Sequence, residues 1–459
     1  MGYRENAETG SEPIYTRLMQ RGLDDPFVSI NAEESRVLTT GEFLGRAVAL
    51  ARQLPDQDYA INLCGNRYNF LLSFCAVIIR GQCNQLPPNK NPGKQREVLA
   101  DYPASYVIHD GAELIAGVQG VDLRSATIPA QRCDEPPRIP LDQLSAINFT
   151  SGSTGKSRPN LKYWSTLQRG GWVNAHHMLE EPEVLHHVLA TVPAQHMYGL
   201  ETSIMLAFSA RLCIHDGQPL YPDDIRKQLE SMPEPRILVS TPVHLRAMLK
   251  SGLDFPPVTL VMSATAPLEL DMARDVEHCF KGRLGEIYGC TEVGSIAWRY
   301  PTRSSAWRAF NAFHFEDRGE STWLHGDHIV ESVELQDVIE FDDDGGFHLR
   351  GRSSDMLNIA GKRGSLAELN RILAATTGVE DGVIFVPTGK DSRPVAFVVA
   401  PELSERDVIA ELRSRVDAVF LPRPVIKVQK LPRGETGKLE RQRLDELYAE
   451  FRTSRTAAK

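Results

Sequence analysis

Between about residues 59 and 290, short apolar runs alternate with longer segments in which apolar residues recur with the period of a helix. Runs of four to eight residues rich in Val, Ile and Leu are typical of strands that are buried on both faces of a parallel sheet. Their alternation with helical segments predicts α/β layering. We expect a helix over 68–80 after the first run, and strands at 59–64, 105–109, 184–192, 211–215, 236–240 and 260–264.

The pattern changes after about residue 310. Alternating strands lead to a turn at 341–347, which indicates a hairpin with an acidic, solvated tip at Asp342 to Asp344. The polar segment 351–355 is a candidate hinge. We therefore predict an α/β fold in which a large N-terminal domain of layered α/β subdomains (1–351) is followed by a small mobile α+β C-terminal domain (352–459). In the small domain we expect helices at 366–376 and 405–420 and strands at 382–387, 395–400 and 425–431.

Bulk properties narrow the class of protein. A chain of 459 residues is long enough for two or three domains. Its net charge of −9 argues against broad affinity for nucleic acid, which requires a positive surface. The N-terminal MGYRENAETG does not resemble a secretory signal, and no apolar run is long enough for a membrane span, so a cytoplasmic location is expected. Seven cysteines without a CxxC pair predict reduced thiols rather than a zinc site.

The segment INFTSGSTGKSRP (147–159) is an apolar run that enters a loop of Thr, Ser and Gly. Small residues allow close approach of the backbone, and successive amides and hydroxyls can surround phosphate oxygens, although a plain polar turn is the alternative. A Walker A loop needs four residues between its first Gly and its GK pair. Here only Ser153 and Thr154 separate Gly152 from Gly155.

TSGSTG with a following lysine resembles the phosphate loop of the adenylate-forming superfamily, which includes acyl-CoA synthetases, aryl acid ligases and the adenylation domains of peptide synthetases. The resemblance implies ATP and Mg²⁺ as cofactors and a catalytic role for Thr154. It also implies an additional cation on the phosphates, for which Lys156 and Lys162 are available and Lys162 is favoured. The residues implied to contact phosphate are Thr150, Ser151, Gly152, Ser153, Thr154 and Gly155.

Further segments resemble motifs of this superfamily in the same order along the chain. PAQHMYGLE (193–201) resembles the segment that lines the acyl pocket, and SATAPL (263–268) resembles the segment beside the adenine. YGCTE (288–292) resembles the strongest short motif of the family. The implied substrate residues are His196, Tyr198 and Gly199; the implied nucleotide contacts are Ala264, Thr265, Tyr288, Gly289 and Thr291; and Glu292 is the implied magnesium-associated and catalytic carboxylate.

The C-terminal third carries the remaining matches. Asp337 precedes Arg352 by 15 residues, close to the family's separation of the ribose-binding Asp from the Arg before the hinge, and Ser354 falls at the hinge position. IAGKRGSLAEL (359–369) resembles the loop along the pantetheine channel, with Gly361 as the matching residue. LPRGETGKLER (431–441) resembles the closing motif and implies that Lys438 is the catalytic lysine.

The resemblance implies a reaction in two steps, in which a carboxylic acid first forms an acyl-AMP and the acyl group is then transferred to a thiol. The segments TSGSTGKSRPNLKYW and PAQHMYGLE resemble the corresponding segments of the stand-alone carrier-protein ligases of xanthomonadin and aryl-polyene pathways. This favours a hydroxybenzoate-like acid and a phosphopantetheinyl acyl carrier protein as the acceptor, with CoA as the alternative. A basic bias in the last domain suits an acidic carrier, through Arg423, Lys427, Lys430, Arg433, Arg441 and Arg443.

Two other interpretations remain open at this stage. A P-loop ATPase would release ADP and phosphate, and an inactive carrier-binding protein would release no pyrophosphate. The pairs His176-His177 and His186-His187 could suggest a metal site, but adjacent side chains diverge on a helix or strand.

Overall fold

The computed structural model describes residues 13–30, 36–151, 157–319, 321–352, 355–359, 362–388, 393–434 and 439–457. The chain divides into two compact units, one of Met1–His314 with His325–Ser332 and the other of Phe315–Leu324 with Val333–Lys459. The second unit thus takes in segments that precede the predicted hinge. The functional domain boundary at residue 352 stays a prediction.

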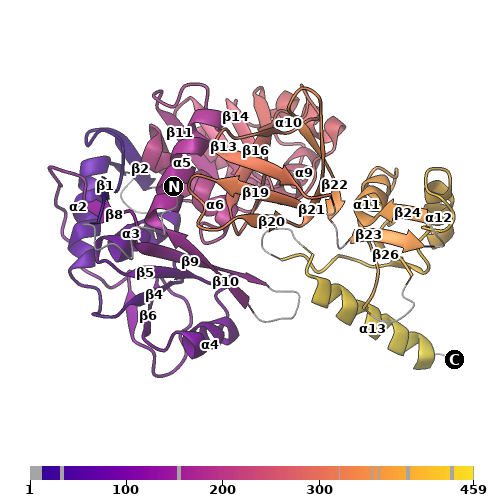
Figure 1. Cartoon of the computed structure of the whole chain (residues 1–459), viewed down its shortest axis with the longest axis horizontal. Coiled ribbons are helices and arrows are strands. Elements are labelled where there is room, and N and C mark those ends of the chain that lie inside the picture. The colour runs from indigo at the N-terminus through magenta and orange to yellow at the C-terminus, as the bar shows by residue number, and fades with distance from the viewer. Residues whose placement is uncertain are drawn as a thin grey trace. The chain divides into compact units, whose positions relative to one another are not determined.

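A nine-stranded sheet dominates the described part of the first unit (Figure 1). Its five central pairings, from β2 to β15, are parallel, and antiparallel strands lie at both edges. The strand order is β17 (Arg308–Ala309), β16 (Gly294–Arg299), β15 (Arg283–Cys290), β14 (Leu260–Ser263), β13 (Arg236–Ser240), β11 (His186–Ala190), β12 (Leu212–His215), β2 (Pro26–Ile30) and β3 (Arg36–Thr39).

Helices cover both faces of this sheet because successive residues of each strand point to opposite sides. On β14, Val261 packs into one apolar cluster, and Leu260 and Met262 pack into another. The first cluster also contains side chains of α8 (Pro222–Ser231), α9 (Pro242–Lys250) and α10 (Leu270–Phe280). The second contains α2 (Thr40–Ala51), α3 (Arg67–Ile79), α5 (Trp164–Met178), α6 (Met197–Leu200), the π-helix η1 (Glu201–Met205) and α7 (Leu206–Ser209).

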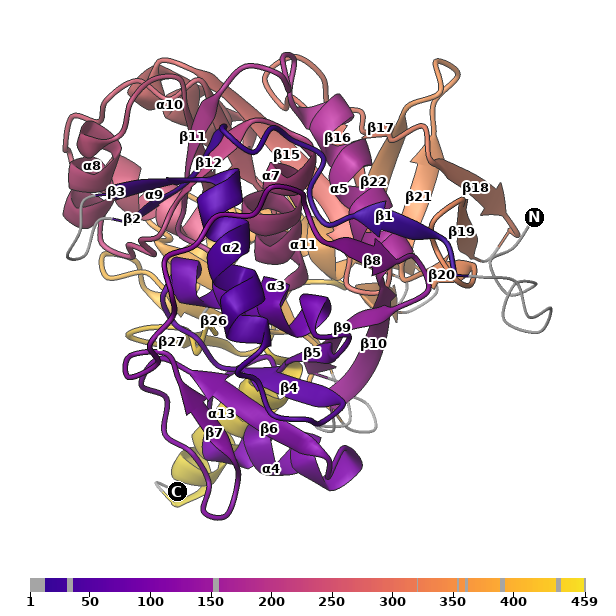
Figure 2. The same ribbon diagram turned by 90° about the vertical axis from the view of Figure 1, so that its left-hand side faces the viewer.

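A six-stranded sheet lies on the other side of α2 and α3 (Figure 2). One face shares their core, and the other packs with α4 (Pro92–Asp101) through Val98. Among the described residues, layers of helix and sheet therefore alternate, as the sequence predicts. The order is β10 (Ser157–Tyr163), β9 (Leu144–Ser151), β5 (Cys83–Leu86), β4 (Tyr59–Asn62), β6 (Ser105–His109) and β7 (Gly120–Asp122), and a separate pair joins β1 (Tyr15–Arg17) to β8 (Arg138–Pro140).

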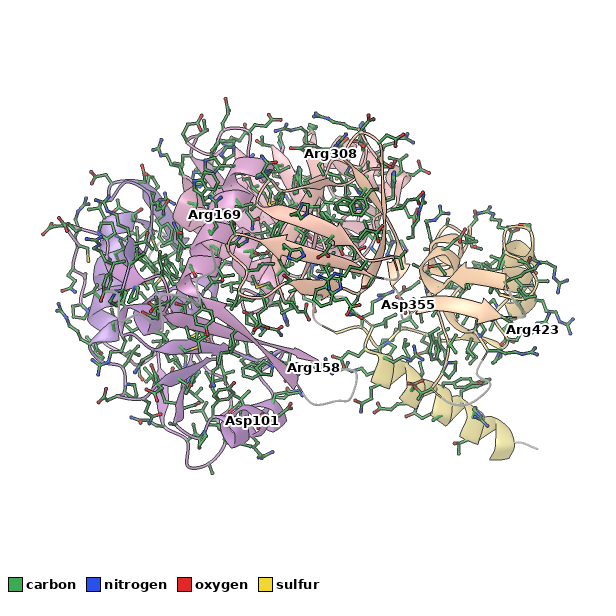
Figure 3. The ribbon with its side chains drawn as sticks, viewed as in Figure 1. Asp101, Arg158, Arg169, Arg308, Asp355 and Arg423 are labelled. Carbon is green, nitrogen blue, oxygen red and sulfur yellow. The ribbon has the colours of Figure 1, made fainter. Side chains whose placement is uncertain are left out.

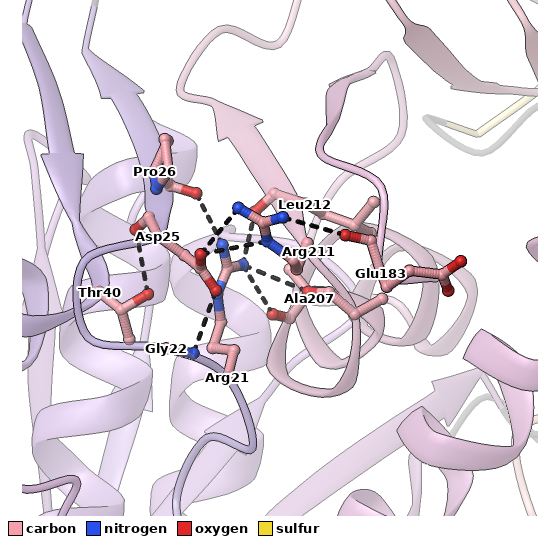
Figure 4. Close-up of polar contacts among 10 residues, drawn as sticks. Arg21, Gly22, Asp25, Pro26, Thr40, Glu183, Ala207, Arg211 and Leu212 are labelled. Carbon is pink, nitrogen blue, oxygen red and sulfur yellow. Dashed lines mark hydrogen bonds and ion pairs between the residues drawn. The ribbon is translucent and has the colours of Figure 1, made fainter. Parts of the chain in front are cut away.

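A half-buried arginine, Arg21, fixes the N-terminal segment to the large sheet (Figure 4). The Arg21 guanidinium donates to the carbonyls of Leu212 at 2.6 Å and Pro26 at 2.7 Å. Burial lowers the pKa of Arg21 to about 10. Nearby, Asp25 pairs with Arg211 at 3.0 Å. These contacts compensate the partly buried charge and connect the N-terminal segment to β2 and β12.

The second unit contains a three-stranded sheet with helices on both faces. One apolar cluster includes α11 (Leu366–Ala374) and α12 (Glu405–Arg413), and another joins the opposite face to α13 (Arg441–Ala457). The three strands are β25 (Asp381–Phe385), β26 (Val395–Val399) and β27 (Val425–Lys427). The remaining strands are β18 (Phe313–Asp317), β19 (Thr322–Gly326), β20 (Val333–Leu335), β21 (Asp337–Phe341), β22 (Phe347–Arg352), β23 (Met356–Ile359) and β24 (Lys362–Ser365).

Most expected elements are confirmed to within a few residues, including the hairpin of β21 and β22. The prediction of one helix over 405–420 is wrong at its C-terminal end, because α12 ends at Arg413. Ser414 is the C-cap, and its hydroxyl donates to the Glu411 carbonyl at 2.7 Å, a local bond that competes with the helical pattern. Among the described residues, we find no helix with both the length and the apolar character needed to cross a bilayer.

Candidate active site

Polar side chains gather where the central parallel strands of the large sheet end. Thr191 follows β11, and its hydroxyl lies 3.0 Å from the Ser240 hydroxyl at the end of β13 and 2.8 Å from Nδ1 of His244. At the end of β14, the buried Ser263 hydroxyl has no hydrogen-bond partner among the described residues. Ligands of open α/β sheets bind outside the carboxyl ends of the strands, so this edge is the expected position for a substrate.

The predicted acyl-pocket segment begins at the same edge. His196 is half-buried and precedes α6 as its N-cap. The Tyr198 hydroxyl donates to the carbonyls of Ser240 and Met262, each at 2.9 Å, and so connects α6 to two strand ends. Burial raises the pKa of Tyr198, so its hydroxyl remains a donor. A Cβ atom on Gly199 would lie 2.0 Å from the Pro193 carbonyl oxygen, so only glycine fits this position.

The predicted adenine segment follows β14 directly. Ala264 is buried, and the next residue, Thr265, has φ +80°. A positive φ is costly for a β-branched residue and persists where the surrounding structure enforces it, often at functional sites. This geometry turns the chain sharply at the end of the sheet.

The YGCTE motif forms the end of β15 and the turn into β16. Tyr288 is buried, and its ring lies 5.9 Å from that of Trp307. Gly289 pairs with Ser295 across the hairpin. Thr291 is half-buried and Glu292 is exposed in the turn, so the Glu292 carboxylate is accessible to a ligand.

Lys162 is brought to this turn from β10. Its side chain is 1% exposed, and its Nζ donates to the Glu292 backbone carbonyl at 2.7 Å. Desolvation by burial lowers the pKa of Lys162. The ammonium is therefore bound to a protein carbonyl, and the expected contact with phosphate stays a prediction.

The first two residues of the predicted phosphate loop belong to the antiparallel ladder of β9 and β10, where Thr150 pairs with Arg158 and Ser151 pairs with Ser157. The structure gives only the backbone placement of Thr150 and Ser151. Gly152, Ser153, Thr154 and Gly155 lie outside the described residues. Arg158 on β10 is exposed (Figure 3). The sequence analysis considered only lysines as cations for this segment and did not consider Arg158.

The second unit contains the other predicted site residues. Asp337 and Arg352 are direct partners in the ladder of β21 and β22. Asp337 is half-buried, and the side chain of Arg352 is not described. Ser354, Gly361 and Lys438 lie outside the described residues.

The donor set at the YGCTE turn fits Mg²⁺. This ion usually takes one or two carboxylates and fills its remaining positions with water and substrate phosphates. Glu292 offers one exposed carboxylate. It lies in a turn that contacts β10 through Lys162. Among the described residues, no group of three His, Cys, Asp or Glu side chains is placed to hold a metal.

Two functional candidates were missed by the sequence analysis. Glu201 closes the PAQHMYGLE segment and accepts bonds from the amide and hydroxyl of Ser295 at 2.8 and 2.7 Å. His244 joins the polar cluster at the strand ends. A carboxylate within an otherwise apolar helical segment was the available signal for Glu201, because such groups are rarely buried without partners.

The comparisons with known proteins agree with this geometry. The model of the family described as AMP-binding enzyme matches residues 20–312, more than half of the chain. A 4-coumarate--CoA ligase of Cereibacter sphaeroides is 28% identical over 298 residues, which cover 63% of this chain and 69% of that protein. A 3,4-dihydroxybenzoate--[aryl-carrier protein] ligase of Bacillus anthracis is 20% identical over 319 residues, 66% of this chain and 74% of that protein.

Solved structures show the same fold. ATP-bound MatB from Rhodopseudomonas palustris superposes with a TM-score of 0.78 at 20% identity, covering 93% of this chain and 97% of that one. The o-succinylbenzoate CoA synthetase MenE of Bacillus subtilis, in complex with ATP and magnesium, gives a TM-score of 0.77 at 16% identity, with 91% and 96% covered. The chain therefore belongs to the AMP-binding enzyme family and is an AMP-forming acid–thiol ligase.

Proposed function

We propose that this chain is an acyl-CoA synthetase that activates an aromatic carboxylic acid as its acyl-AMP and transfers the acyl group to CoA. The observation that carries the proposal is the similarity to the 4-coumarate--CoA ligase of Cereibacter sphaeroides, 28% identical over 63% of this chain. A 2-succinylbenzoate--CoA ligase of Listeria monocytogenes, 26% identical over 67% of the chain, supports the same acid class and acceptor. A cytoplasmic location, where ATP and CoA are available, is part of the proposal.

In the first half-reaction, the substrate carboxylate attacks the α-phosphorus of ATP and pyrophosphate leaves. Positioning and electrostatic stabilisation supply most of the catalysis in such a transfer. The donors of the loop 150–155, with Thr154 and Thr291, would orient the phosphates, and the Lys438 ammonium would neutralise charge that develops on them. Mg²⁺, when bound, neutralises charge on the phosphate oxygens, and Glu292 would hold it.

The acid and the nucleoside are assigned to neighbouring positions. His196, Tyr198 and Gly199 would line the acid, and Ala264, Thr265, Tyr288 and Gly289 would border the adenine. Asp337 would accept hydrogen bonds from the ribose, with Arg352 following it in the same hairpin. The short polar network of Thr191, Ser240 and His244 at the strand ends supports a polar contact to the acid carboxylate or phosphate.

In the second half-reaction, a thiolate attacks the acyl-AMP carbonyl and AMP leaves with the bonding electrons. Lys438 would then occupy the approach of the thiol. We propose that residues 352–459 rotate about Ser354, which removes Lys438 and brings Gly361 to the pantetheine channel. Each half-reaction would thus use a different surface of the same small domain.

A free-standing aryl carrier protein is the second candidate acceptor. The sequence analysis preferred it, with a hydroxybenzoate-like substrate, and the carrier-protein ligase of Bacillus anthracis supports it at 20% identity. The CoA ligases among the relatives are more similar to this chain, and they favour CoA. The family match also argues against the P-loop ATPase alternative, and the inactive-protein alternative is tested by acid-dependent release of pyrophosphate.

The test is an acceptor assay with the full chain. The chain is incubated with ATP, Mg²⁺ and a panel of benzoates, cinnamates and fatty acids, and CoA or a phosphopantetheinylated aryl carrier protein is then supplied. Mass spectrometry of the products should show aryl-CoA. If the aryl group were found on the carrier protein and no aryl-CoA formed, the carrier protein and not CoA would be the acceptor. Fatty acyl products alone would contradict the aromatic substrate class.

A further inference from the structure

Two buried charged residues lie under the turn that presents Glu292. Lys162 comes from β10 and Glu201 from the first position of η1, segments that are far from β15 and β16 in the sequence. Both are less than a tenth exposed, at 1% and 6%. Removing charges from water is expensive unless they are paired or hydrogen-bonded, so their presence here requires an explanation.

Lys162 holds the middle of the turn. Its Nζ donates to the Glu292 carbonyl at 2.7 Å, which fixes the backbone of the residue whose carboxylate is exposed. Hydrogen bonds from charged donors are stronger than neutral ones, and the donor here is buried. An apolar side chain of equal length could fill the same space but could not hold this carbonyl.

Glu201 binds the residues that directly follow the turn. One carboxylate oxygen accepts both the amide and the hydroxyl of Ser295, at 2.8 and 2.7 Å. The other lies so close to Gly294 that a Cβ atom there would be 2.2 Å from it. Gly294 also has φ +105°, a conformation that favours glycine. The start of β16 is therefore shaped around the Glu201 carboxylate.

The two residues also stabilise each other electrostatically. Burial raises the pKa of Glu201 to about 7, and Lys162 opposes this shift by favouring the carboxylate. In the same way, Glu201 opposes the lowering of the Lys162 pKa by burial. Replacement of either residue therefore leaves the other as a less compensated buried charge.

We propose that Lys162 and Glu201 are positioning residues that set the Glu292 turn for binding of a divalent cation together with ATP. This inference rests on the proposed function, in which Glu292 holds Mg²⁺. Groups that orient a metal ligand from behind typically contribute about 10 to 100-fold to metal affinity. The assignment differs from a direct contact between Lys162 and the phosphates, because it acts through the Glu292 backbone.

The test compares Lys162→Met and Glu201→Gln with Glu286→Gln in the full chain. Glu286 is a matched control because it is a buried carboxylate of the same β15-β16 hairpin, paired with Arg299 at the end away from the turn. Mn²⁺ serves as the probe, and its binding in the presence of ATP is followed by electron paramagnetic resonance. Binding of ATP alone, in EDTA, is measured by calorimetry, and thermal unfolding is recorded for every variant.

Lys162→Met should weaken Mn²⁺ binding in the presence of ATP about tenfold and change binding of ATP alone by less than about twofold. Glu201→Gln should weaken Mn²⁺ binding less, because an amide oxygen can still accept from Ser295. Glu286→Gln should leave Mn²⁺ binding unchanged. Ser295→Ala removes one hydroxyl only and should shift Mn²⁺ binding in the same direction even if Lys162→Met does not fold.

An equal loss of ATP binding in EDTA would overturn the inference in favour of a direct phosphate contact. Unchanged Mn²⁺ affinity in the Lys162 and Ser295 variants, or an equal loss in Glu286→Gln, would also overturn it. Failure of the proposed function is recognised separately, because the wild-type chain would then show no acid-dependent exchange of pyrophosphate into ATP.

Discussion

Asp337 and Arg352 lie directly opposite each other in the antiparallel ladder of β21 and β22. A separation of 15 residues in the sequence thus becomes a cross-strand pair, with the hairpin turn at Asp342 to Gly346 between them. Any movement of this hairpin carries both residues together. If Asp337 binds the ribose, Arg352 is held at a fixed position relative to the nucleoside and marks the start of the proposed hinge.

Asp337→Asn should raise the KM for ATP about 10 to 100-fold, because a charged acceptor contributes about 1.5 to 3 kcal/mol to a hydrogen bond. The KM for the acid should change little. Asp344→Asn at the tip of the same hairpin is the control and should leave both constants unchanged. Steady-state kinetics of pyrophosphate release gives these values, and an unchanged KM for ATP in Asp337→Asn would contradict the ribose assignment.

Lys438→Ala should reduce adenylation about 10² to 10³-fold, the scale for loss of one preorganised group that stabilises developing charge. Thioester formation from supplied acyl-AMP should continue, because Lys438 is proposed to leave the site for that step. The two half-reactions are assayed separately, with Lys430→Ala as a control for loss of a positive charge in the same domain. Equal losses in both half-reactions would argue against the assignment.

Gly199→Ala should destabilise the fold by about 1 to 3 kcal/mol, because the new methyl group must displace the chain at Pro193. Gly93→Ala is the matched control, since a Cβ atom on Gly93 in α4 meets nothing within 4 Å. Urea unfolding measures both. If Gly199→Ala were as stable as the control, α6 could move away from the segment before it without a loss of free energy of unfolding, which would contradict this prediction.

Glu201 makes stability depend on pH in a defined direction. Its pKa is raised from 4.5 to about 7 by burial, so the folded state binds more protons than the unfolded state between these values. Stability therefore falls as pH rises through this window, and Glu201→Gln lacks this dependence. We expect wild type to lose about 1 to 3 kcal/mol relative to Glu201→Gln between about pH 5 and pH 7.5.

Urea unfolding at a series of pH values measures this difference. The pKa of Lys162, lowered by burial, acts in the opposite direction at higher pH, which is why the comparison stops near neutrality. Glu411→Gln, which changes an exposed carboxyl on α12, is the control. A constant difference between wild type and Glu201→Gln across the window would contradict the assigned shift.

The sequence predicts elements well where one local signal dominates. The runs at 105–109 and 236–240 become β6 and β13 with the predicted bounds, because each is a short apolar segment that is buried on both faces. The end of α12 was missed because the Ser414 hydroxyl binds the Glu411 carbonyl, a local side-chain contact that periodicity does not report.

The candidate site also has features that the sequence predicts and features that only the structure shows. Ordered motifs predict that Tyr198 and Glu292 belong to one site, and the structure adds what each contacts. The bond from Lys162 to the Glu292 carbonyl joins residues that are 130 positions apart, and it depends on how β10 packs beside the β15-β16 turn. Long-range backbone contacts of this kind have no signature in a single sequence. The burial of Glu201 beneath Gly294 was missed for the same reason.

The most direct test of the account is an analysis of the nucleotide products. With ATP, Mg²⁺, an aromatic acid and CoA, the chain should release AMP and pyrophosphate in equal amounts, and omission of the acid should abolish both. Without CoA, radiolabelled pyrophosphate should still exchange into ATP in the presence of the acid. Release of ADP and phosphate, or pyrophosphate release that does not depend on any acid, would contradict the central claim that a carboxylate is joined to AMP in this site.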